Sequence, residues 1–185
     1  MYQKKMTPFT ERVIDSGAYV TIEAPPGAGK TQVLREIAIR YTPSIILAYN
    51  NALRLHLSES IGDNPDVMCC TFHGLCSRCI RPVRDDAQML KAINDVENGV
   101  VPCVNNEIIN TIVIDEAQDV RALYIRLLHT IGFTSLASRI YVFGDRNQLI
   151  YDWDVKFQAS LDVLLSPNVH VRRGVQWNRL TIHNT

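Results

Sequence analysis

Short apolar stretches alternate along this chain with longer stretches in which apolar side chains recur every three or four residues. The apolar stretches predict strands at residues 18–23, 44–49, 67–72, 111–114 and 139–143. Helical spacing predicts helices at residues 30–40, 51–59 and 120–131, and Gly132 ends the last of them. This alternation predicts an α/β fold, with a mostly parallel β-sheet flanked by helices on both faces.

Size and charge narrow the class of protein. The 185 residues suit one domain or two small ones, and a 46% hydrophobic composition supports a packed core. The 19 basic and 19 acidic side chains cancel, so any nucleic-acid contact must come from a local patch. No apolar stretch is long enough to span a membrane, and the N-terminus lacks the pattern of a signal peptide. We therefore expect an intracellular protein, cytoplasmic or nuclear, that is not secreted and has no membrane partner.

The cysteines are clustered, because four of the five lie within residues 69–79. Cys70, His73, Cys76 and Cys79 follow one another at intervals of three, which is reminiscent of a zinc site. In a helix, however, a spacing of three carries side chains around the axis and does not direct all four towards one ion. The pattern therefore favours reduced, buried thiols over a disulfide framework or structural zinc.

A glycine-rich segment joins the first predicted strand to the first predicted helix. It consists of Ala24, Pro25, Pro26, Gly27, Ala28, Gly29, Lys30 and Thr31. Gly27 and Gly29 allow successive backbone N–H groups to turn inward around phosphates, and the start of the helix adds partial positive charge. Lys30 is then expected to reach the β- and γ-phosphates of ATP, and the Thr31 hydroxyl to bind Mg²⁺. The segment predicts a phosphate-binding loop of the Walker A type.

Two adjacent acids, Asp115 and Glu116, follow the apolar strand predicted at residues 111–114. Ligands bind at this end of the strands in such sheets. Asp115 is expected to hold Mg²⁺, as in a Walker B segment, and Glu116 to orient or deprotonate an attacking water. Asp119 is a candidate cap for the next helix. Together with the phosphate-binding loop, these acids predict ATP hydrolysis.

A third polar segment follows the strand predicted at residues 139–143. Gln148 is suited to hydrogen-bond a γ-phosphate, and Tyr151 and Trp153 offer flat faces on which single-stranded bases can stack. Ordinary packing between domains is the alternative role for the two aromatic side chains.

In this order, the three segments resemble motifs I, II and III of the UvrD/Rep family of superfamily 1 DNA helicases, and residues 44–53 and 71–73 resemble motifs Ia and Ib. The resemblance implies the first RecA-like domain of that family, a P-loop NTPase fold. It implies an ATPase site formed by Lys30, Thr31, Asp115, Glu116 and Gln148. It also implies that a single DNA strand is faced by Tyr49, Asn50, Phe72, His73, Tyr151 and Trp153.

The sequence also departs from the family pattern. Gln32 stands where relatives carry an arginine near the nucleotide, and only Thr10 and Glu11 lie where an adenine-reading glutamine is expected. The segment between the loop and the acids is short, so we expect only a small variable insertion at residues 84–106. We therefore expect residues 1–185 to form a single RecA-like domain. Its tail, residues 166–185, is expected to lead towards a second RecA-like domain.

These features predict the ATP-binding half of an ATP-dependent single-stranded-DNA translocase or helicase. Hydrolysis of Mg-ATP would be coupled to DNA unwinding only when a second RecA-like domain or a partner polypeptide completes the site, and the domain alone would bind single-stranded DNA weakly. One alternative is a nucleotide-dependent interaction module without productive turnover. A small P-loop nucleotide kinase is a further alternative, but it leaves the second and third segments unexplained.

Overall fold

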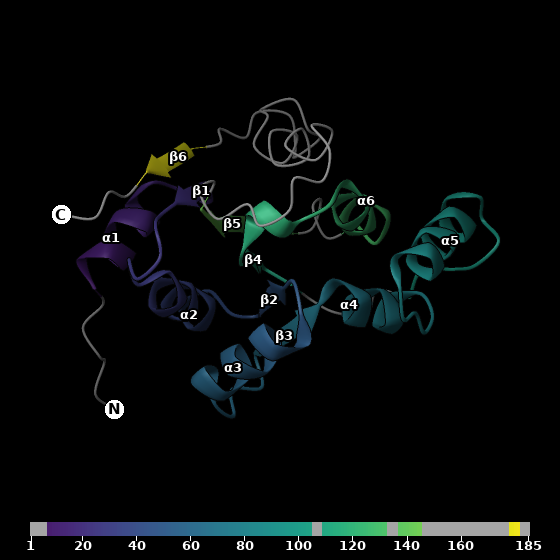
Figure 1. Ribbon diagram of the computed structural model, residues 1–185, viewed down its shortest axis with the longest axis horizontal. Coiled ribbons are helices and arrows are strands. Elements are labelled where there is room, and N and C mark those ends of the chain that lie inside the picture. The colour runs from purple at the N-terminus through teal and green to yellow at the C-terminus, as the bar shows by residue number, and fades with distance from the viewer. Residues whose placement is uncertain (1–6, 105–108, 133–136, 146–177, 182–185) are drawn as a thin grey trace.

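A six-stranded sheet forms the centre of the molecule in the computed structural model, which describes residues 7–104, 109–132, 137–145 and 178–181 (Figure 1). The strand order is β3-β2-β4-β5-β1-β6, and all neighbouring strands are parallel. The strands are β1 (Tyr19–Glu23), β2 (Ser44–Ala48), β3 (Val67–Thr71), β4 (Thr111–Ile114), β5 (Arg139–Gly144) and β6 (Asn178–Thr181). The predicted α/β fold with a parallel sheet is confirmed.

Helices cover both faces of this sheet. They are α1 (Pro8–Asp15), α2 (Lys30–Arg40), α3 (Asn51–Ile61), α4 (Phe72–Cys79), α5 (Asp86–Glu97) and α6 (Ala122–Thr130), with a 3₁₀ turn, η1 (Ala117–Asp119). Side chains alternate along each strand, so Ile45 and Leu47 pack with α4, α5 and α6, whereas Ile46 and Ala48 pack with α1, α2 and α3. The sheet therefore has a hydrophobic core on each side.

The predicted elements match the structure with small changes at their ends. The helix predicted at residues 30–40 is confirmed, and the one predicted at residues 51–59 continues to Ile61. The strand predicted at residues 67–72 ends one residue earlier, because the Thr71 hydroxyl accepts a hydrogen bond from the backbone N–H of Gly74 (3.0 Å) and caps α4. Phe72 is therefore the first residue of a helix.

The expected insertion at residues 84–106 contributes a helix, α5, to the core. Met89, Ala92 and Ile93 lie on one side of α5 and are completely buried. Asp85 begins the helix by accepting a hydrogen bond from the backbone N–H of Gln88 (2.8 Å), and the Gln88 side chain accepts one from the backbone N–H of Arg84 (2.9 Å). This reciprocal pair resembles a capping box.

The end of the sheet also differs from expectation. Residues 178–181 fall in the expected tail, but they form β6 beside β1, with Val20 opposite Asn178 and Glu23 opposite Thr181. Part of the expected tail thus belongs to the sheet of this domain.

The cysteines in the clustered segment are free thiols. Cys76 and Cys79 pack into the core beside α5 and α6, and burial raises the pKa of the Cys76 thiol to about 11 because it penalises the thiolate. His73 pairs with Asp86. Across the described ranges, no group of three or more His, Cys, Asp and Glu side chains is arranged to hold a metal ion.

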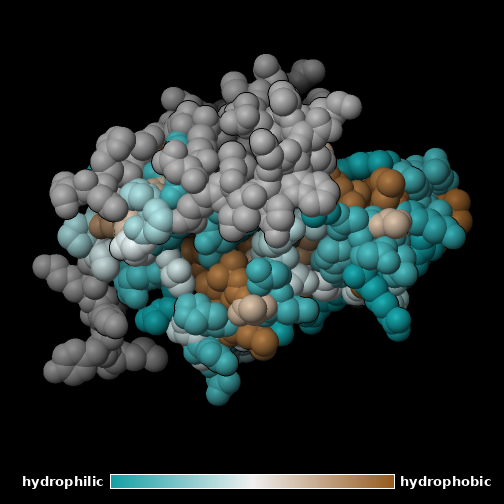
Figure 2. Space-filling model, in the orientation of Figure 1, coloured by the Kyte–Doolittle hydropathy of each residue, from teal (hydrophilic) through white to brown (hydrophobic). Residues whose placement is uncertain are grey.

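On the face shown in Figure 2, the surface of the described residues is mainly hydrophilic, and hydrophobic side chains gather in a few groups, one of them at the end of the molecule where α5 lies. Exposed large hydrophobic residues include Leu55 on α3, and Leu90 and Val100 on and after α5. None of the helices in the described segments combines the length and apolar character needed to cross a membrane.

Candidate nucleotide-binding site

The glycine-rich segment forms an open loop between β1 and α2. Gly29 immediately precedes α2 and has a left-handed backbone (φ 82°), as does Gly27 (φ 75°). A Cβ added at either glycine would meet no atom within 4 Å, so the glycines serve the backbone conformation and leave the loop open. The backbone N–H of Ala24 donates to the carbonyl of Gly144 (3.1 Å) and fixes the start of the loop to the end of β5.

Lys30 begins α2 with its side chain folded back over this loop. Its ammonium group donates to the carbonyl oxygens of Ala24 (2.9 Å) and Pro25 (3.4 Å), and only 8% of the residue is exposed. These carbonyls hold the cation at the loop, where a phosphate oxygen would be a stronger, charged acceptor. Thr31 follows in the first turn of the helix and is partly buried. This placement agrees with the predicted phosphate-binding loop.

Gln32 takes part in a contact between α1 and α2. Its amide donates to the Glu36 carboxylate, which also accepts hydrogen bonds from the Thr10 hydroxyl and from the backbone N–H of Thr7 (3.3 Å). Burial alone would raise the pKa of Glu36, but the hydrogen bonds from Thr10, Gln32 and Thr7 hold it below its ordinary value. Glu36 therefore joins α2 to α1, and the Gln32 amide, within α2, orients its carboxylate, whereas the family pattern predicts that Gln32 lies near the nucleotide.

The two adjacent acids lie at the end of β4. The backbone N–H of Asp115 donates to the Leu47 carbonyl (3.1 Å), and its carboxylate accepts from the backbone N–H of Glu116 (2.9 Å). Only 2% of Asp115 is exposed. Burial and the neighbouring charge of Glu116 raise the pKa of Asp115 to about 6, while the hydrogen bond from Glu116 and the positive charge of Lys30 act in the opposite direction.

Lys30 and Asp115 are therefore close enough to interact electrostatically, although they come from distant parts of the chain. They meet because parallel strands end at the same edge of the sheet, and β5 alone lies between β1 and β4. An open loop, a buried cation and a buried carboxylate are the groups that suit a nucleoside triphosphate with a divalent cation.

Glu116 has an unusual backbone. Its φ of 49° makes it the one non-glycine residue in the described ranges with a left-handed conformation. Such a conformation costs of order 1 kcal/mol or more and is concentrated at functional sites, where surrounding contacts maintain it. Here the Gln118 amide donates to the Glu116 carboxylate (2.6 Å) and holds it in one orientation.

Gln118 also joins the acids to the end of β5. Its side-chain oxygen accepts a hydrogen bond from the backbone N–H of Asp145 (3.1 Å), while its amide holds Glu116. A Cβ on Gly144 would lie 3.1 Å from this oxygen, so the side chain passes close to the β5 backbone. Sequence reasoning gave Gln118 no role, although it stands within the acidic segment that carried the family resemblance.

Asp119 does not cap the next helix, so that expectation is wrong. It lies in η1, and α6 begins only at Ala122, after Arg121, which makes no side-chain capping bond. Burial and the charge of Glu116 raise the pKa of Asp119 above its ordinary value. The acid therefore adds negative charge beside Glu116.

The residues expected to face DNA divide into two groups. Tyr49, Asn50, Phe72 and His73 are described, whereas Tyr151 and Trp153 lie outside the described residues, as does Gln148, which was expected in the ATPase site. Asn50 caps α3, because its side-chain oxygen accepts a hydrogen bond from the backbone N–H of Leu53 (2.8 Å). Asn50 lies at the sheet edge, as expected, but its side-chain oxygen is occupied in capping the helix.

Phe72 requires a correction, because its ring is buried. Only 1% of the residue is exposed, and the ring stacks on Tyr124 with 4.6 Å between centroids and 9° between planes. This placement follows from the early end of β3, which turns Phe72 into the core as the first residue of α4. In this structure the Phe72 ring packs against Tyr124 in the core and does not face a DNA strand.

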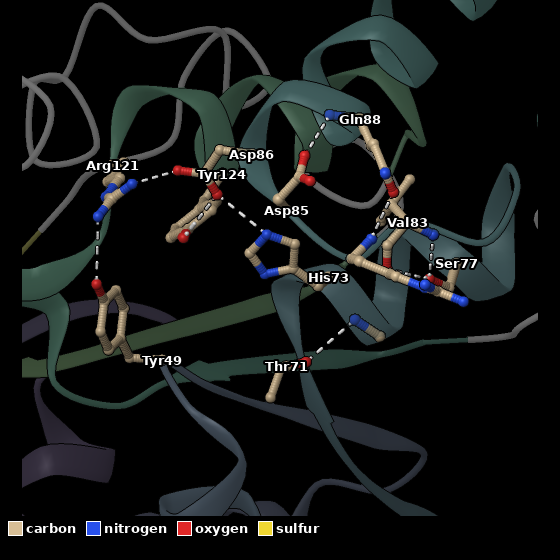
Figure 3. A network of polar contacts seen from close by, with 12 residues as sticks. Tyr49, Thr71, His73, Ser77, Val83, Asp85, Asp86, Gln88, Arg121 and Tyr124 are labelled. Atoms are coloured by element: carbon tan, nitrogen blue, oxygen red, sulfur yellow. Dashed lines mark hydrogen bonds and ion pairs between the residues drawn. The ribbon is translucent and has the colours of Figure 1, made fainter.

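Tyr49 and His73 lie at opposite ends of one polar network (Figure 3). His73 Nε2 is 3.0 Å from a carboxylate oxygen of Asp86, which also pairs with Arg121. Arg121 in turn donates to the Tyr49 hydroxyl (3.4 Å). Sequence reasoning missed Asp86, Arg121 and the neighbouring Tyr124, because nothing in the local pattern links these positions.

Solved structures with a similar fold include helicases. Unliganded Pif1 from Bacteroides sp aligns with a TM-score of 0.54 and 16% identity over 97% of this chain and 42% of its own. Bacteroides sp Pif1 in complex with ADP-AlF4 aligns with a TM-score of 0.51 and 16% identity, over 97% of this chain and 43% of its own. The Pyrococcus furiosus Hef helicase domain aligns with a TM-score of 0.52 and 16% identity, over 97% of this chain and 38% of its own. These matches confirm the predicted RecA-like fold.

The chain spans less than half the length of each of these structures. Among curated proteins, no sequence shows significant similarity to it. The sequence pattern of the AAA domain family matches residues 12–154, which include the phosphate-binding loop and both acids. Because this match covers most of the chain, the protein belongs to the AAA domain family.

Proposed function

We propose that this chain is the ATP-binding domain of an ATP-dependent, superfamily 1 type translocase or helicase that acts on single-stranded DNA. One observation carries the proposal: the fold places Lys30, at the start of α2, at the same sheet edge as the buried carboxylate of Asp115 and the constrained Glu116 after β4. A cation for phosphates and two acids with different surroundings are the groups that ATP hydrolysis requires.

Each of these residues has a role in the proposal. The backbone of residues 24–29 and Lys30 would bind the phosphates, and Thr31 and Asp115 would hold Mg²⁺. Mg²⁺ would neutralise charge on the phosphate oxygens. Glu116 would orient the attacking water and accept its proton, and Gln118 would keep the carboxylate in place.

The DNA-related part of the proposal rests on the family resemblance together with the sheet edge. Tyr49, Asn50 and His73 follow β2 and β3 at that edge, next to the acids after β4. Translocation requires two domains that open and close on the strand, and the second domain supplies an arginine whose loss costs about 10³–10⁵ in rate. We therefore infer that unwinding requires a second RecA-like domain or a partner polypeptide.

Nucleotide binding is the first test. We expect isothermal titration with Mg-ATP to show binding by the wild type and roughly 10–100-fold weaker binding by Lys30→Ala, because the variant loses charged contacts to phosphate. Lys91→Ala is the matched control, since Lys91 is exposed on α5. Equal affinity in the Lys30 and Lys91 variants would contradict the assigned site.

Turnover is the second test, measured as release of phosphate with and without single-stranded DNA. Glu116→Gln should abolish any turnover while retaining nucleotide, whereas Glu59→Gln, at an exposed position on α3, should leave both unchanged. Full hydrolysis by Glu116→Gln would refute its role. ATP binding without turnover in the wild type, even with DNA, would favour a nucleotide-dependent interaction module.

A further inference from the structure

Three polar side chains converge on one carboxylate at the start of α5, and two of them, Arg121 and Tyr124, donate hydrogen bonds to it. Asp86 accepts a hydrogen bond from the Tyr124 hydroxyl (3.2 Å), lies 3.0 Å from His73 Nε2 and pairs with the Arg121 guanidinium (Figure 3). Arg121 also donates to the Tyr49 hydroxyl (3.4 Å). A guanidinium group, an imidazole and phenol hydroxyls form a donor set that suits a phosphate oxygen as well as it suits a carboxylate.

Aromatic contacts support Tyr124 and His73 in this site. The Tyr124 ring stacks on the buried Phe72 (4.6 Å between centroids), and His73 meets the edge of Tyr124 (5.9 Å). Burial, together with the nearby Asp86 carboxylate, raises the pKa of Tyr124, so its hydroxyl stays protonated and remains a donor. Tyr124 and His73 are therefore held in place by ring contacts that do not involve Asp86.

Arg121 and Asp86 make this site accessible to solvent, because 40% and 30% of their side chains are exposed. The His73 side chain is 28% exposed, but its Nε2 atom is buried, and only 3% of Tyr124 is exposed. Asp86 stands in the first turn of α5, whereas the residues that fix this helix in the core, Met89 and Ile93, lie further along it. A change of the Asp86 rotamer would thus open the site without moving the helix.

We propose that the Asp86 carboxylate occupies the position of a nucleic-acid phosphate, held by Arg121, Tyr124 and His73, and that a phosphodiester group must displace it to bind at this edge. This inference rests on the proposed function, since it concerns the strand-binding edge of the same domain. It adds Arg121 as a phosphate-binding residue, and it makes Asp86 a competitor that weakens binding of a single strand. Ordinary anchoring of α5 on α6 is the simpler interpretation that the experiment must exclude.

The test compares two variants of the same helix. Asp86→Asn and Asp95→Asn each remove one negative charge from α5, and each breaks an ion pair with an arginine, because Asp95 pairs with Arg81 (2.7 Å). Binding of a fluorescein-labelled oligo(dT) to the full chain is followed by fluorescence anisotropy without nucleotide, over a range of KCl concentrations. Circular dichroism and urea unfolding establish that each variant is folded.

We expect Asp86→Asn to bind the oligonucleotide roughly tenfold more tightly than the wild type. The slope of log K against log salt should steepen by about 0.7, because one more phosphate is neutralised. Asp95→Asn should leave both quantities unchanged, and adding Arg121→Gln to Asp86→Asn should remove the gain. The asparagine can still accept a hydrogen bond from Tyr124, which makes this variant conservative for folding.

Three outcomes would overturn the inference: unchanged affinity in Asp86→Asn, no detectable oligonucleotide binding by either the wild type or that variant, and an equal gain in Asp95→Asn, which would reflect net charge alone. If Asp86→Asn does not fold, Arg121→Gln in the wild-type background should weaken binding and lower the salt slope, whereas Arg81→Gln should not. A lack of difference between these two would also overturn it. ATP binding by the same samples separates this failure from failure of the proposed function.

Discussion

Asp115 carries a charge that the fold disfavours, and replacing it should stabilise the protein. The pKa of this carboxyl is about 6 in the folded protein and 3.8 as its ordinary value, mainly because the side chain is buried and Glu116 is close. Asparagine has nearly the same shape, and its oxygen can still accept the hydrogen bond from the backbone N–H of Glu116 (2.9 Å). Asp115→Asn therefore removes the charge and keeps the local contact.

The direction follows from proton linkage. Between about pH 4 and pH 6 the folded state binds a proton at Asp115 that the unfolded state has released, so the free energy of unfolding falls as pH rises. The raised pKa corresponds to about 3 kcal/mol in total, since each unit contributes 1.36 kcal/mol. About half of this, roughly 1.5 kcal/mol, is lost between about pH 5 and pH 8. Asparagine does not titrate and escapes this loss.

The assay is urea unfolding followed by circular dichroism, in EDTA and without nucleotide, at about pH 5 and pH 8. We expect Asp115→Asn to be more stable than the wild type at both, by about 1.5 kcal/mol and about 3 kcal/mol respectively. Asp63→Asn is the control, because it changes the same group at an exposed position after α3. A variant less stable than the wild type at about pH 8, or a difference independent of pH, would refute the reasoning.

Three further predictions concern the loop, the core and a helix cap. Gly29→Ala should destabilise the chain by about 1–2 kcal/mol in urea unfolding and weaken Mg-ATP binding, because its φ of 82° strains an L-residue although nothing lies within 4 Å of the added Cβ. Leu34→Ala should cost about 2–5 kcal/mol, since Leu34 is fully buried, whereas Leu55→Ala, at a residue that is 51% exposed, should stay within about 0.5 kcal/mol. Asn50→Ala should cost about 1 kcal/mol and Asn50→Ser much less, because serine can also cap α3.

The parts of the site that sequence could predict are those fixed by local geometry. A loop with Gly27, Gly29 and Lys30 must follow a strand and begin a helix, and Asp115 must follow an apolar strand, so the order of elements already places them at one sheet edge. The positive φ of Glu116 was not predictable, because no glycine or asparagine marks that position.

The end of β3 shows where a sequence pattern becomes ambiguous. Thr71 and Phe72 suit a strand, and they suit equally well a capping residue followed by the first residue of a helix. The choice depends on the contact of Phe72 with Tyr124, 52 positions later in the chain. Tertiary packing therefore decided whether this aromatic side chain faces a ligand or the core, and periodicity could not.

Helix α5 combines two requirements that a variable surface insertion would not meet. Met89, Ala92 and Ile93 close the core over α4 and α6, so this part of the expected insertion is a buried structural element. Asp86, in the first turn, is not one of the buried residues of α5, and it pairs with His73 and Arg121 and accepts a hydrogen bond from Tyr124. Because the two sets lie at different positions on the helix, substitutions can separate them. A substitution at Asp86 that altered the affinity for single-stranded DNA without shifting the urea transition would show that α5 controls DNA binding at the sheet edge as well as stabilising the core.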